Sequence, residues 1–295
     1  MLYALNPAKN RILRCDTDGN NEQTVVNGLD RIPDGLVIDE AKRHIYFTQM
    51  GKPNWKEQTA FDNDGSIWRV GMDGTSLTCI VHPGGTRTPK QITADFAAKK
   101  LYWCDREGMR VMRCNLDGSR IETLVETGRV PEDERDMARW CVGIAVDSEA
   151  GFVYWTQKGT SDTGEGSIRR AGVEIPAGET ARNRSDVEVL FDNLPEAIDL
   201  ELDKQHGYLY WTDRGNLPGG NSVCRAKFAS NGSLERDHEV IVEGTGETIG
   251  VAFDHAGGNM YITAINGDLY RAAIQGGLPE KIGNFGMLTG IAFVA

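Results

Sequence analysis

Short apolar runs separated by turn-forming residues repeat along the whole chain. In most repeats one run closes on an aspartate, and seven residues later a tyrosine begins a second run, as in Asp203 and Tyr210. A third run carries an arginine such as Arg225, and is usually followed by a hairpin-type turn such as Asp73-Gly74 and then by a fourth run. The tyrosines that mark the repeats are Tyr3, Tyr46, Tyr102, Tyr154, Tyr210 and Tyr261.

Four short strands in each of six repeats predict an all-β fold, a six-bladed β-propeller of four-stranded blades. The two ends of the chain complement each other. Residues 288–293 have the pattern of the first strand of a blade, but no second strand follows them. Residues 1–3 have the pattern of a second strand, but no first strand precedes them. We therefore expect the C-terminal first strand to pair with the N-terminal second strand and close the ring, which removes open sheet edges. Residues 1–295 are expected to be one complete propeller domain.

The second runs carry the pattern Tyr210-Trp211-Thr212-Asp213 or variants of it, such as Tyr154-Trp155-Thr156-Gln157 and Tyr102-Trp103-Cys104-Asp105. On this pattern the chain resembles the YWTD, or class B low-density-lipoprotein-receptor, propeller family over its whole length. The resemblance implies the six-bladed fold. It also implies that the motif residues hold each blade together and do not themselves form a site.

Composition limits the partners and the cellular compartment that we expect for the protein. The chain has 43 acidic and 32 basic side chains, for a net charge of −11, and its basic residues do not cluster. We therefore expect no nucleic-acid partner. No apolar run reaches about 18 residues, so no membrane span is expected. Six cysteines are dispersed over the blades and no secretory leader precedes the first strand, which predicts a reduced, cytoplasmic protein.

The longest loops are expected on one face of the propeller, called the top face, where second strands lead to third strands and each blade leads to the next. The loop over residues 49–65 carries Trp55 and Phe61, and the loop over residues 126–140 ends in Arg139-Trp140. Binding sites are usually carried on loops that a rigid scaffold positions. The asymmetry predicts a top-face pocket over the channel, although the aromatic residues could instead anchor their own loops.

The first strands should line the central channel, where glycine usually stands four residues before the aspartate. Gln91 and Asp199 break this pattern, and Glu201 lies on the same strand face as Asp199 because side chains two residues apart share a face. A carboxylate pair in a narrow apolar channel is costly unless it is bonded or functional. One acid could hold its proton and act as a general acid, or the pair could bond backbone amides and water.

Residues from all six blades are expected around the top mouth of the channel. Their mixture of acids, an amine, a guanidinium, an indole and a thioether suits a small, partly apolar, partly oxygenated ligand. Five histidines are scattered without ligand spacing, so neither a metal nor a cofactor is expected. The candidate catalytic residues are Asp199, Glu201, Glu196 and Glu247, and the candidate substrate-binding residues are Asp34, Trp55, Lys90, Gln91, Arg139, Trp140 and Met287.

Two enzyme resemblances bear on function. Residues 33–39, Pro-Asp-Gly-Leu-Val-Ile-Asp, are similar to the metal-binding segment of gluconolactonase-like propellers, but only Asp34 carries over. The chain also resembles stand-alone YWTD propellers of fungal natural-product pathways, some of which control pericyclic ring formation, including hetero-Diels–Alder additions. That likeness implies an acid that creates a quinone methide and an aromatic pocket that orients the partner alkene.

The sequence therefore predicts a small-molecule enzyme of specialised metabolism, a cyclase or lyase of the hetero-Diels–Alder kind. A gluconolactonase-like hydrolase is the first alternative. A propeller that binds a protein partner without catalysis is the second alternative. A closed top-face pocket favours a ligand, whereas a flat apolar patch favours a protein.

Overall fold

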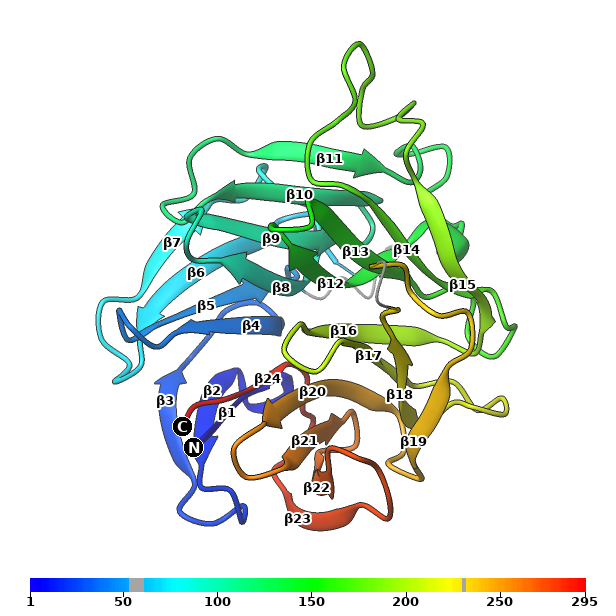
Figure 1. Ribbon diagram of the computed structural model, residues 1–295. Coiled ribbons are helices and arrows are strands. Elements are labelled where there is room, and N and C mark those ends of the chain that lie inside the picture. The colour runs from blue at the N-terminus through cyan, green and yellow to red at the C-terminus, as the bar shows by residue number, and fades with distance from the viewer. Residues whose placement is uncertain (53–60, 230–231) are drawn as a thin grey trace.

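The computed structural model describes residues 1–52, 61–229 and 232–295. Six four-stranded antiparallel sheets are arranged as blades around a central channel, which confirms the predicted fold class (Figure 1). The first strands, innermost in each blade, are β24 (Ile291–Phe293), β4 (Pro33–Asp39), β8 (Pro89–Asp95), β12 (Cys141–Asp147), β16 (Ala197–Asp203) and β20 (Thr248–Asp254). The second strands are β1 (Leu2–Asn6), β5 (His44–Gln49), β9 (Lys100–Asp105), β13 (Phe152–Gln157), β17 (Tyr208–Asp213) and β21 (Asn259–Ala264).

The outer half of each blade consists of a third and a fourth strand. The third strands are β2 (Arg11–Cys15), β6 (Ser66–Gly71), β10 (Arg110–Asn115), β14 (Gly166–Gly172), β18 (Ser222–Lys227) and β22 (Asp268–Ala273). The fourth strands are β3 (Gln23–Asn27), β7 (Thr78–Val81), β11 (Glu122–Glu126), β15 (Glu188–Leu194), β19 (Glu239–Glu243) and β23 (Glu280–Asn284). Two short 3-10 helices, η1 (Pro7–Lys9) and η2 (Met137–Arg139), lie in connecting loops.

The ring closes between the two ends of the chain, as predicted. β24 pairs antiparallel with β1, with Leu2 opposite Phe293 and Tyr3 opposite Ala292. Beyond the strand the pairing continues, because the N–H of Leu5 donates to the carbonyl oxygen of Gly290 at 3.0 Å. The two termini lie side by side in Figure 1. The closing blade therefore has a covalent break that its neighbours lack, and hydrogen bonds together with the packing of Leu2 and Ala4 against Ile291 hold it shut.

The aspartate that ends most first strands has the same structural role in each blade. The Oδ1 atom of Asp203 accepts a hydrogen bond from the N–H of His206 at 3.0 Å and so fixes the turn into β17. Because this turn has a constant length, the tyrosine of the motif always follows the aspartate by seven residues. The equivalent bonds are Asp39 to Lys42, Asp95 to Ala98, Asp147 to Ala150 and Asp254 to Gly257.

The hydrophobic core consists of layers between neighbouring blades. Tyr154 of one blade packs with Leu209 and Trp211 of the next, and all three side chains are buried. The channel itself is tight, because a Cβ atom added at Gly143 would lie 2.1 Å from the carbonyl oxygen of Ile198 on the next first strand. Glycine at this position therefore lets adjacent first strands approach closely.

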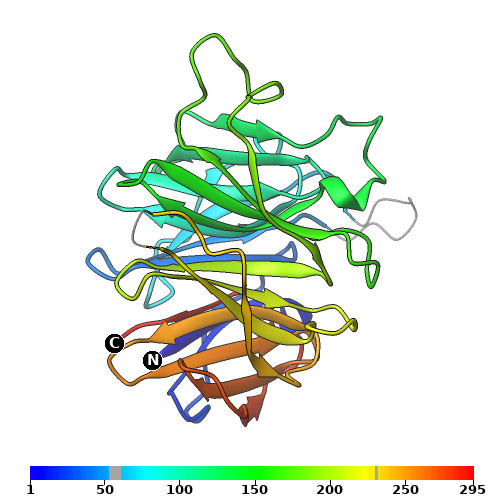
Figure 2. The ribbon, with the colours of Figure 1, turned by 45° about the vertical axis from the view of Figure 1, so that its right-hand side comes forward.

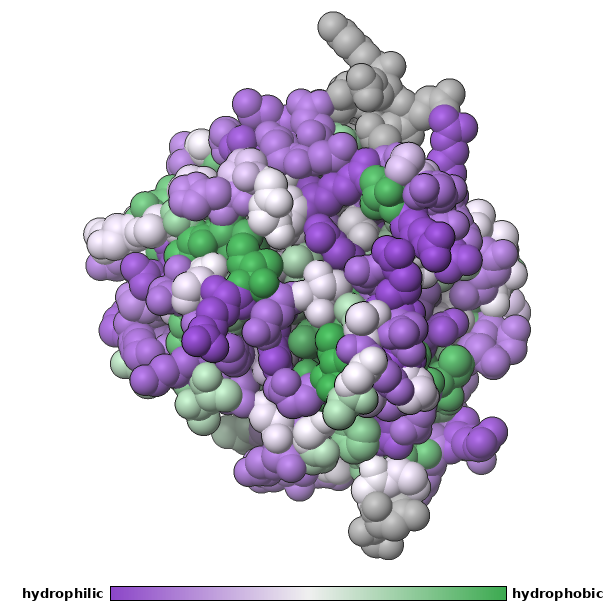
Figure 3. Space-filling view, turned by 90° about the horizontal axis from the view of Figure 1, so that it is seen from above, coloured by the Kyte–Doolittle hydropathy of each residue, from purple (hydrophilic) through white to green (hydrophobic). Residues whose placement is uncertain are grey.

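The long loops and the chain ends lie on opposite faces. Figure 2 shows the loop that carries η2 projecting on the side away from both termini. This side is the top face defined above, and the turns between first and second strands form the bottom face. The outer surface seen in Figure 3 is mostly hydrophilic, with small and separate apolar patches. Among the described residues, no helix has the length and apolar character needed to cross a membrane.

Candidate active site at the top mouth of the channel

Three cationic residues each follow the four-residue motif directly and stand at the top mouth of the channel. They are Arg106, Lys158 and Arg214, which come after Asp105, Gln157 and Asp213 in three consecutive blades. In each case the N–H donates to the carbonyl oxygen of a residue just before the first strand of the same blade, at 3.0 to 3.2 Å. The second strand thus ends beside the start of the first strand, at the top mouth of the channel. The residue after the motif therefore lies at this mouth.

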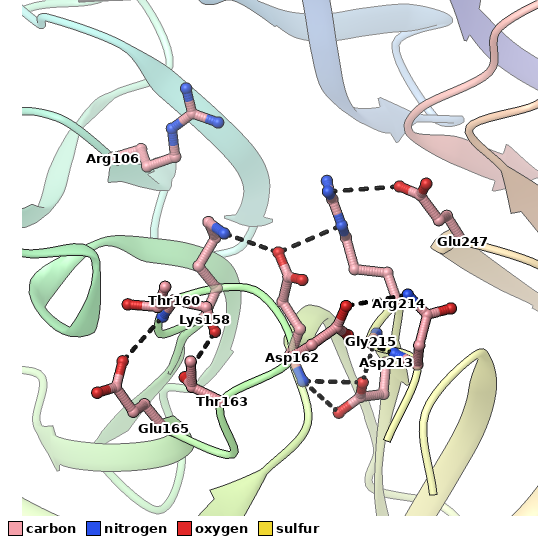
Figure 4. A network of polar contacts seen from close by, with 12 residues as sticks. Arg106, Lys158, Thr160, Asp162, Thr163, Glu165, Asp213, Arg214, Gly215 and Glu247 are labelled. Carbon is pink, nitrogen blue, oxygen red and sulfur yellow. Dashed lines mark hydrogen bonds and ion pairs between the residues drawn. The ribbon is translucent and has the colours of Figure 1, made fainter. Parts of the chain in front are cut away.

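Glu196 joins two of these cations. Its Oε1 atom lies 2.7 Å from the Nζ atom of Lys158 and 3.2 Å from the Nε atom of Arg214, and the side chain is 2% exposed. Arg214 also contacts Glu247, with 3.3 Å between the Nη2 and Oε2 atoms. Figure 4 shows these ion pairs as one connected chain, with Arg106 on a neighbouring blade. The two predicted acids Glu196 and Glu247 are therefore brought together, through a cation that sequence reasoning had missed.

Burial lowers the pKa of the Lys158 ammonium group, and the nearby Arg214 and Arg106 guanidinium groups lower it further. The hydrogen bond to Glu196 opposes this change. A lysine in such surroundings gives up its proton more readily than a solvated one. Lys158 is thus suited to proton transfer, whereas Arg106 and Arg214 remain positively charged.

Arg106 lies between charged and aromatic groups. Its guanidinium group forms an ion pair with Glu107 and lies 5.0 Å from the ring centre of Trp140 and 5.7 Å from that of Phe61. Trp140 also donates its ring N–H to the carbonyl oxygen of Glu134 at 3.2 Å, inside its own loop. The ring therefore both anchors the loop and presents a face to the mouth. Trp55 lies outside the described residues.

Asp34 and Lys90 form an ion pair between neighbouring blades. The Asp34 side chain is fully buried, and its Oδ2 atom has no hydrogen-bond partner among the described residues. Burial lowers the pKa of Lys90 while the Asp34 carboxylate raises it, and burial prevails. The Lys90 ammonium group thus binds the Oδ1 atom of Asp34 and leaves the Oδ2 atom open. Gln91, on the same strand as Lys90, is 5% exposed, and its Nε2 atom has no hydrogen-bond partner in the part of the chain that the structure describes.

Two predicted mouth residues stand apart from this group. The guanidinium group of Arg139 bonds Asp136 at 2.8 Å and the carbonyl oxygen of Thr127 at 2.9 Å, so it stabilises the loop over residues 126–140. Its outer side faces a surface cavity shared with Arg182, away from the mouth cations. Met287 is 41% exposed.

The two channel acids lie in different surroundings. The carboxylate of Asp199 accepts hydrogen bonds from the N–H groups of Leu200 at 3.0 Å and Val251 at 3.2 Å. Bonds of this kind to backbone amides were expected if the acid has a structural role and not a catalytic one. Burial nevertheless raises the pKa of Asp199 to about 7. Glu201 instead lines a cavity of about 270 Å³ that opens toward the bottom face, among Val37, Thr93 and Ala292. Burial, and then the Asp199 carboxylate, raise the pKa of Glu201 well above its usual value.

The structure also corrects the expectation that the histidines are scattered. His206 and His255 come from turns of adjacent blades, and their ring centres lie 5.2 Å apart beside Asp203. Sequence spacing conceals this contact, because the residues belong to different repeats. An alignment of the repeats at the aspartate would have placed both histidines in equivalent turns. The same alignment would have shown a cationic residue after the motif in three successive blades.

Comparison with known proteins agrees with this architecture. No family model matches the chain. It is 45% identical over 294 residues to low-density lipoprotein receptor-related protein 1 of Pyricularia oryzae, covering 96% of this chain and 92% of that relative. It is also 37% identical over 280 residues to the 3-hydroxyacyl-CoA dehydrogenase-like protein LAM1 of Cochliobolus heterostrophus. The match covers 92% of this chain but 57% of LAM1.

Solved structures share the fold at low sequence identity. The propeller in the crystal structure of a nidogen/laminin complex superposes with a TM-score of 0.70 at 20% identity, over 99% of this chain and 96% of that one. A 6-phosphogluconolactonase from Bacteroides fragilis, described as putative, superposes with a TM-score of 0.56 at 12% identity, over 100% of this chain and 97% of that one. With its repeats, its closed ring and its 45% identical relative, the chain belongs to the low-density lipoprotein receptor-related family of six-bladed YWTD propellers.

Proposed function

We propose that this protein is a cofactor-independent enzyme that cyclises, or eliminates water from, a small oxygenated molecule bound at the top mouth of the channel. One observation carries the proposal: Lys158 and Arg214 bind the buried carboxylate of Glu196, and Arg106 of the preceding blade is near enough to lower the pKa of Lys158. A fold alone does not imply function. A cluster of partly desolvated cations beside an aromatic ring is a specific arrangement that can stabilise a developing oxyanion.

The guanidinium groups would bind a phenol or enol oxygen of the substrate. Arg106 and Arg214 keep their charge, so they favour the oxyanion over the neutral hydroxyl. Each preorganised donor of this kind contributes about 10²-fold to a rate when it is aimed at the developing charge. The ring of Trp140, already in contact with Arg106, would lie against the apolar part of the substrate.

Loss of water would then proceed by two proton transfers. Glu247, which is 48% exposed and paired with Arg214, takes the phenolic proton. Lys158 gives a proton to a benzylic hydroxyl group, the C–O bond breaks, and water leaves with that bonding pair. The phenolate oxygen supplies the electron pair that forms the new C=O bond of a neutral quinone methide. A proton passing from Glu247 to Lys158 restores the site.

Addition of an alkene to the quinone methide needs no further proton transfer. One C–C bond and one C–O bond form together, and the protein's contribution is to hold the two partners in one orientation. Orientation alone can supply about 7 kcal/mol or more of the barrier. This explains why no catalytic motif is needed beyond the mouth residues.

The lengths of the relatives and the state of the cysteines support the proposal of a cytoplasmic enzyme. The propeller accounts for 92% of the relative from Pyricularia oryzae, and LAM1 combines such a region with further sequence under the name of a dehydrogenase-like protein. Because the match covers 57% of LAM1, nothing specific about dehydrogenase chemistry is transferred to this chain. All six cysteines are free, which supports the proposal of a reducing, cytoplasmic location.

The test is turnover of a 2-(hydroxymethyl)phenol with an electron-rich cyclic alkene, followed by chiral chromatography of the chroman product. Wild-type protein should raise the rate and give one enantiomer in excess. Arg106→Met and Lys158→Met should each lower the rate by about 10²-fold or more, measured at a temperature where both variants remain folded. The matched controls are Arg182→Met and Lys281→Met, which remove surface ion pairs with Glu126 and Asp268.

Two outcomes would count against the proposal. Equal turnover in the mouth variants and the controls would remove the mouth from the mechanism. Absence of turnover, combined with a protein partner that loses affinity only in the mouth variants, would support the protein-binding alternative.

A further inference from the structure

The turns between first and second strands repeat one scaffold, but two of them carry histidines. The aspartate that fixes each turn is followed by variable residues, and only blades five and six place histidine there, as His206 and His255. These blades are neighbours, so β16–β17 and β20–β21 bring both turns to the same part of the bottom face (Figure 1). Both turns border the bottom opening of the channel, where Asp203 and His255 line the cavity of about 270 Å³.

The three side chains converge through one carboxylate oxygen. The Oδ2 atom of Asp203 lies 2.8 Å from the Nδ1 atom of His206 and 3.6 Å from the Nδ1 atom of His255. One ligand atom from each residue lies within 4.8 Å of the others. Among the described residues this is the one group of three or more histidine, cysteine or acidic side chains with such spacing.

We propose that Asp203, His206 and His255 bind a divalent transition-metal ion, of which zinc is the most suitable, at the bottom mouth of the channel. Two imidazole nitrogens and one carboxylate oxygen are the donor set of open zinc sites, and they disfavour calcium and magnesium, which prefer oxygen ligands. Three protein ligands leave a fourth position for water or for an oxygen atom of a ligand in the cavity. The ion would also link blade five to blade six.

Neighbouring groups already hold the donors in place. The Oδ1 atom of Asp203 is fixed by the N–H of His206, which leaves Oδ2 for the ion. The ring of His255 stacks on Phe253, with ring centres 5.6 Å apart and planes inclined by 16°. Such supporting contacts orient metal ligands. The adjacent Lys204 is bonded to Asp147 at 2.8 Å and to Glu149 at 2.6 Å on blade four, so its charge does not occupy the site.

The bottom site is independent of the proposed reaction at the top mouth, so its test measures binding and not turnover. Full-length protein is freed of metal with a chelator, dialysed, and titrated with Zn²⁺ by calorimetry and with Co²⁺ by absorption spectroscopy. We expect one ion per chain and a Co²⁺ spectrum without a thiolate charge-transfer band. His206→Asn and His255→Asn should each weaken binding by at least about tenfold, since even supporting residues contribute that much.

The matched control is His82→Asn, because His82 is exposed and lies outside this group. It should bind Zn²⁺ as the wild type does. Both ligand histidines are partly exposed, with side chains 49% and 36% accessible, so their asparagine variants should remain folded. Zn²⁺ should raise the melting temperature of the wild type and of His82→Asn but not of His255→Asn. Equal affinity in all three asparagine variants, or a thiolate band that assigns the ion to cysteine, would overturn the proposal.

Discussion

The hydroxyl group of Thr212 donates a hydrogen bond to the carbonyl oxygen of Ile249, 2.8 Å away on the first strand of the next blade. The same hydroxyl accepts a hydrogen bond from the N–H of Asp199 on its own blade at 2.9 Å. The third residue of the motif thus ties two blades together beside the channel. The equivalent bonds to the next blade run from Thr48 to Lys90, from Thr156 to Ile198 and from Thr263 to Thr289.

Replacing Thr212 by valine should therefore destabilise the ring. Valine keeps the shape but loses both hydrogen bonds and leaves the buried N–H of Asp199 without a partner, which costs about 1–3 kcal/mol. Unfolding in urea should show a reduced free energy with an unchanged slope. Thr78→Val is the control, because the Thr78 side chain is exposed and donates to the nearby carbonyl oxygen of Ser76. If both variants unfold alike, the inter-blade bond is not a stabilising contact.

The second prediction concerns the contribution of the ion pair between Asp34 and Lys90 to stability. Lys90→Met leaves the fully buried Asp34 carboxylate without its cation, and breaking such a buried pair typically costs about 3–5 kcal/mol. Adding Asp34→Asn removes the unpaired charge, so the double variant should recover most of that loss. A double-mutant cycle from chemical unfolding measures the coupling. Strictly additive effects would mean that the two groups do not interact.

Stability should depend on pH through Asp199. Burial raises its pKa to about 7, although the N–H groups of Val251 and Leu200 act in the opposite direction. The unfolded carboxyl titrates near pH 4, so between about pH 4 and 7 the folded chain holds a proton that the unfolded chain has lost. The stabilising contribution is present below about pH 4 and is lost as the pH rises through 7, at up to about 1.4 kcal/mol per unit.

Asp199→Asn does not titrate, so it removes this contribution together with the effect of the Asp199 carboxylate on the pKa of Glu201. The melting temperature of the variant relative to the wild type should rise from pH 5 to about pH 7 and level off above it. Asp213, whose pKa burial also raises to about 7, remains in both proteins and cancels from the difference. A constant difference across this range would show that Asp199 is already ionised at pH 5.

Deleting residues 288–295 should open the ring. The deletion removes β24 and its pairing with β1, and so exposes strand edges that promote aggregation. A lower melting temperature and loss of monomer in size-exclusion chromatography are expected. Deleting Ala295 alone is the control, because β24 and the bond between Val294 and Met1 remain. An unchanged melting temperature in the longer deletion would show that closure contributes nothing to stability.

The fold could be predicted from the sequence because its determinants are local and repeated. Asp203 fixes a turn of constant length, and this makes the interval to Tyr210 the same in most repeats. Ring closure was predictable for the same reason, since each end of the chain supplies the strand that the other lacks.

The candidate site was predictable only in part. Glu196 and Glu247, predicted as neighbours because both precede first strands, are joined in the structure by Arg214, which was missed. The reason is that contacts across the channel connect residues from different repeats, which spacing along the chain does not encode. Arg139 was assigned to the mouth from its position in a loop, and the path of that loop depends on hydrogen bonds such as that to Thr127.

Because the closing blade is assembled from both ends of the chain, the termini meet on the bottom face and leave the top mouth clear. A short peptide linker between Ala295 and Met1 would produce a circular chain, which could be cut at any connection between blades to give circularly permuted forms. A polypeptide fused to either end would likewise sit below the ring, so substrate access from above would be retained. This propeller could therefore be joined to other domains without blocking its own entrance.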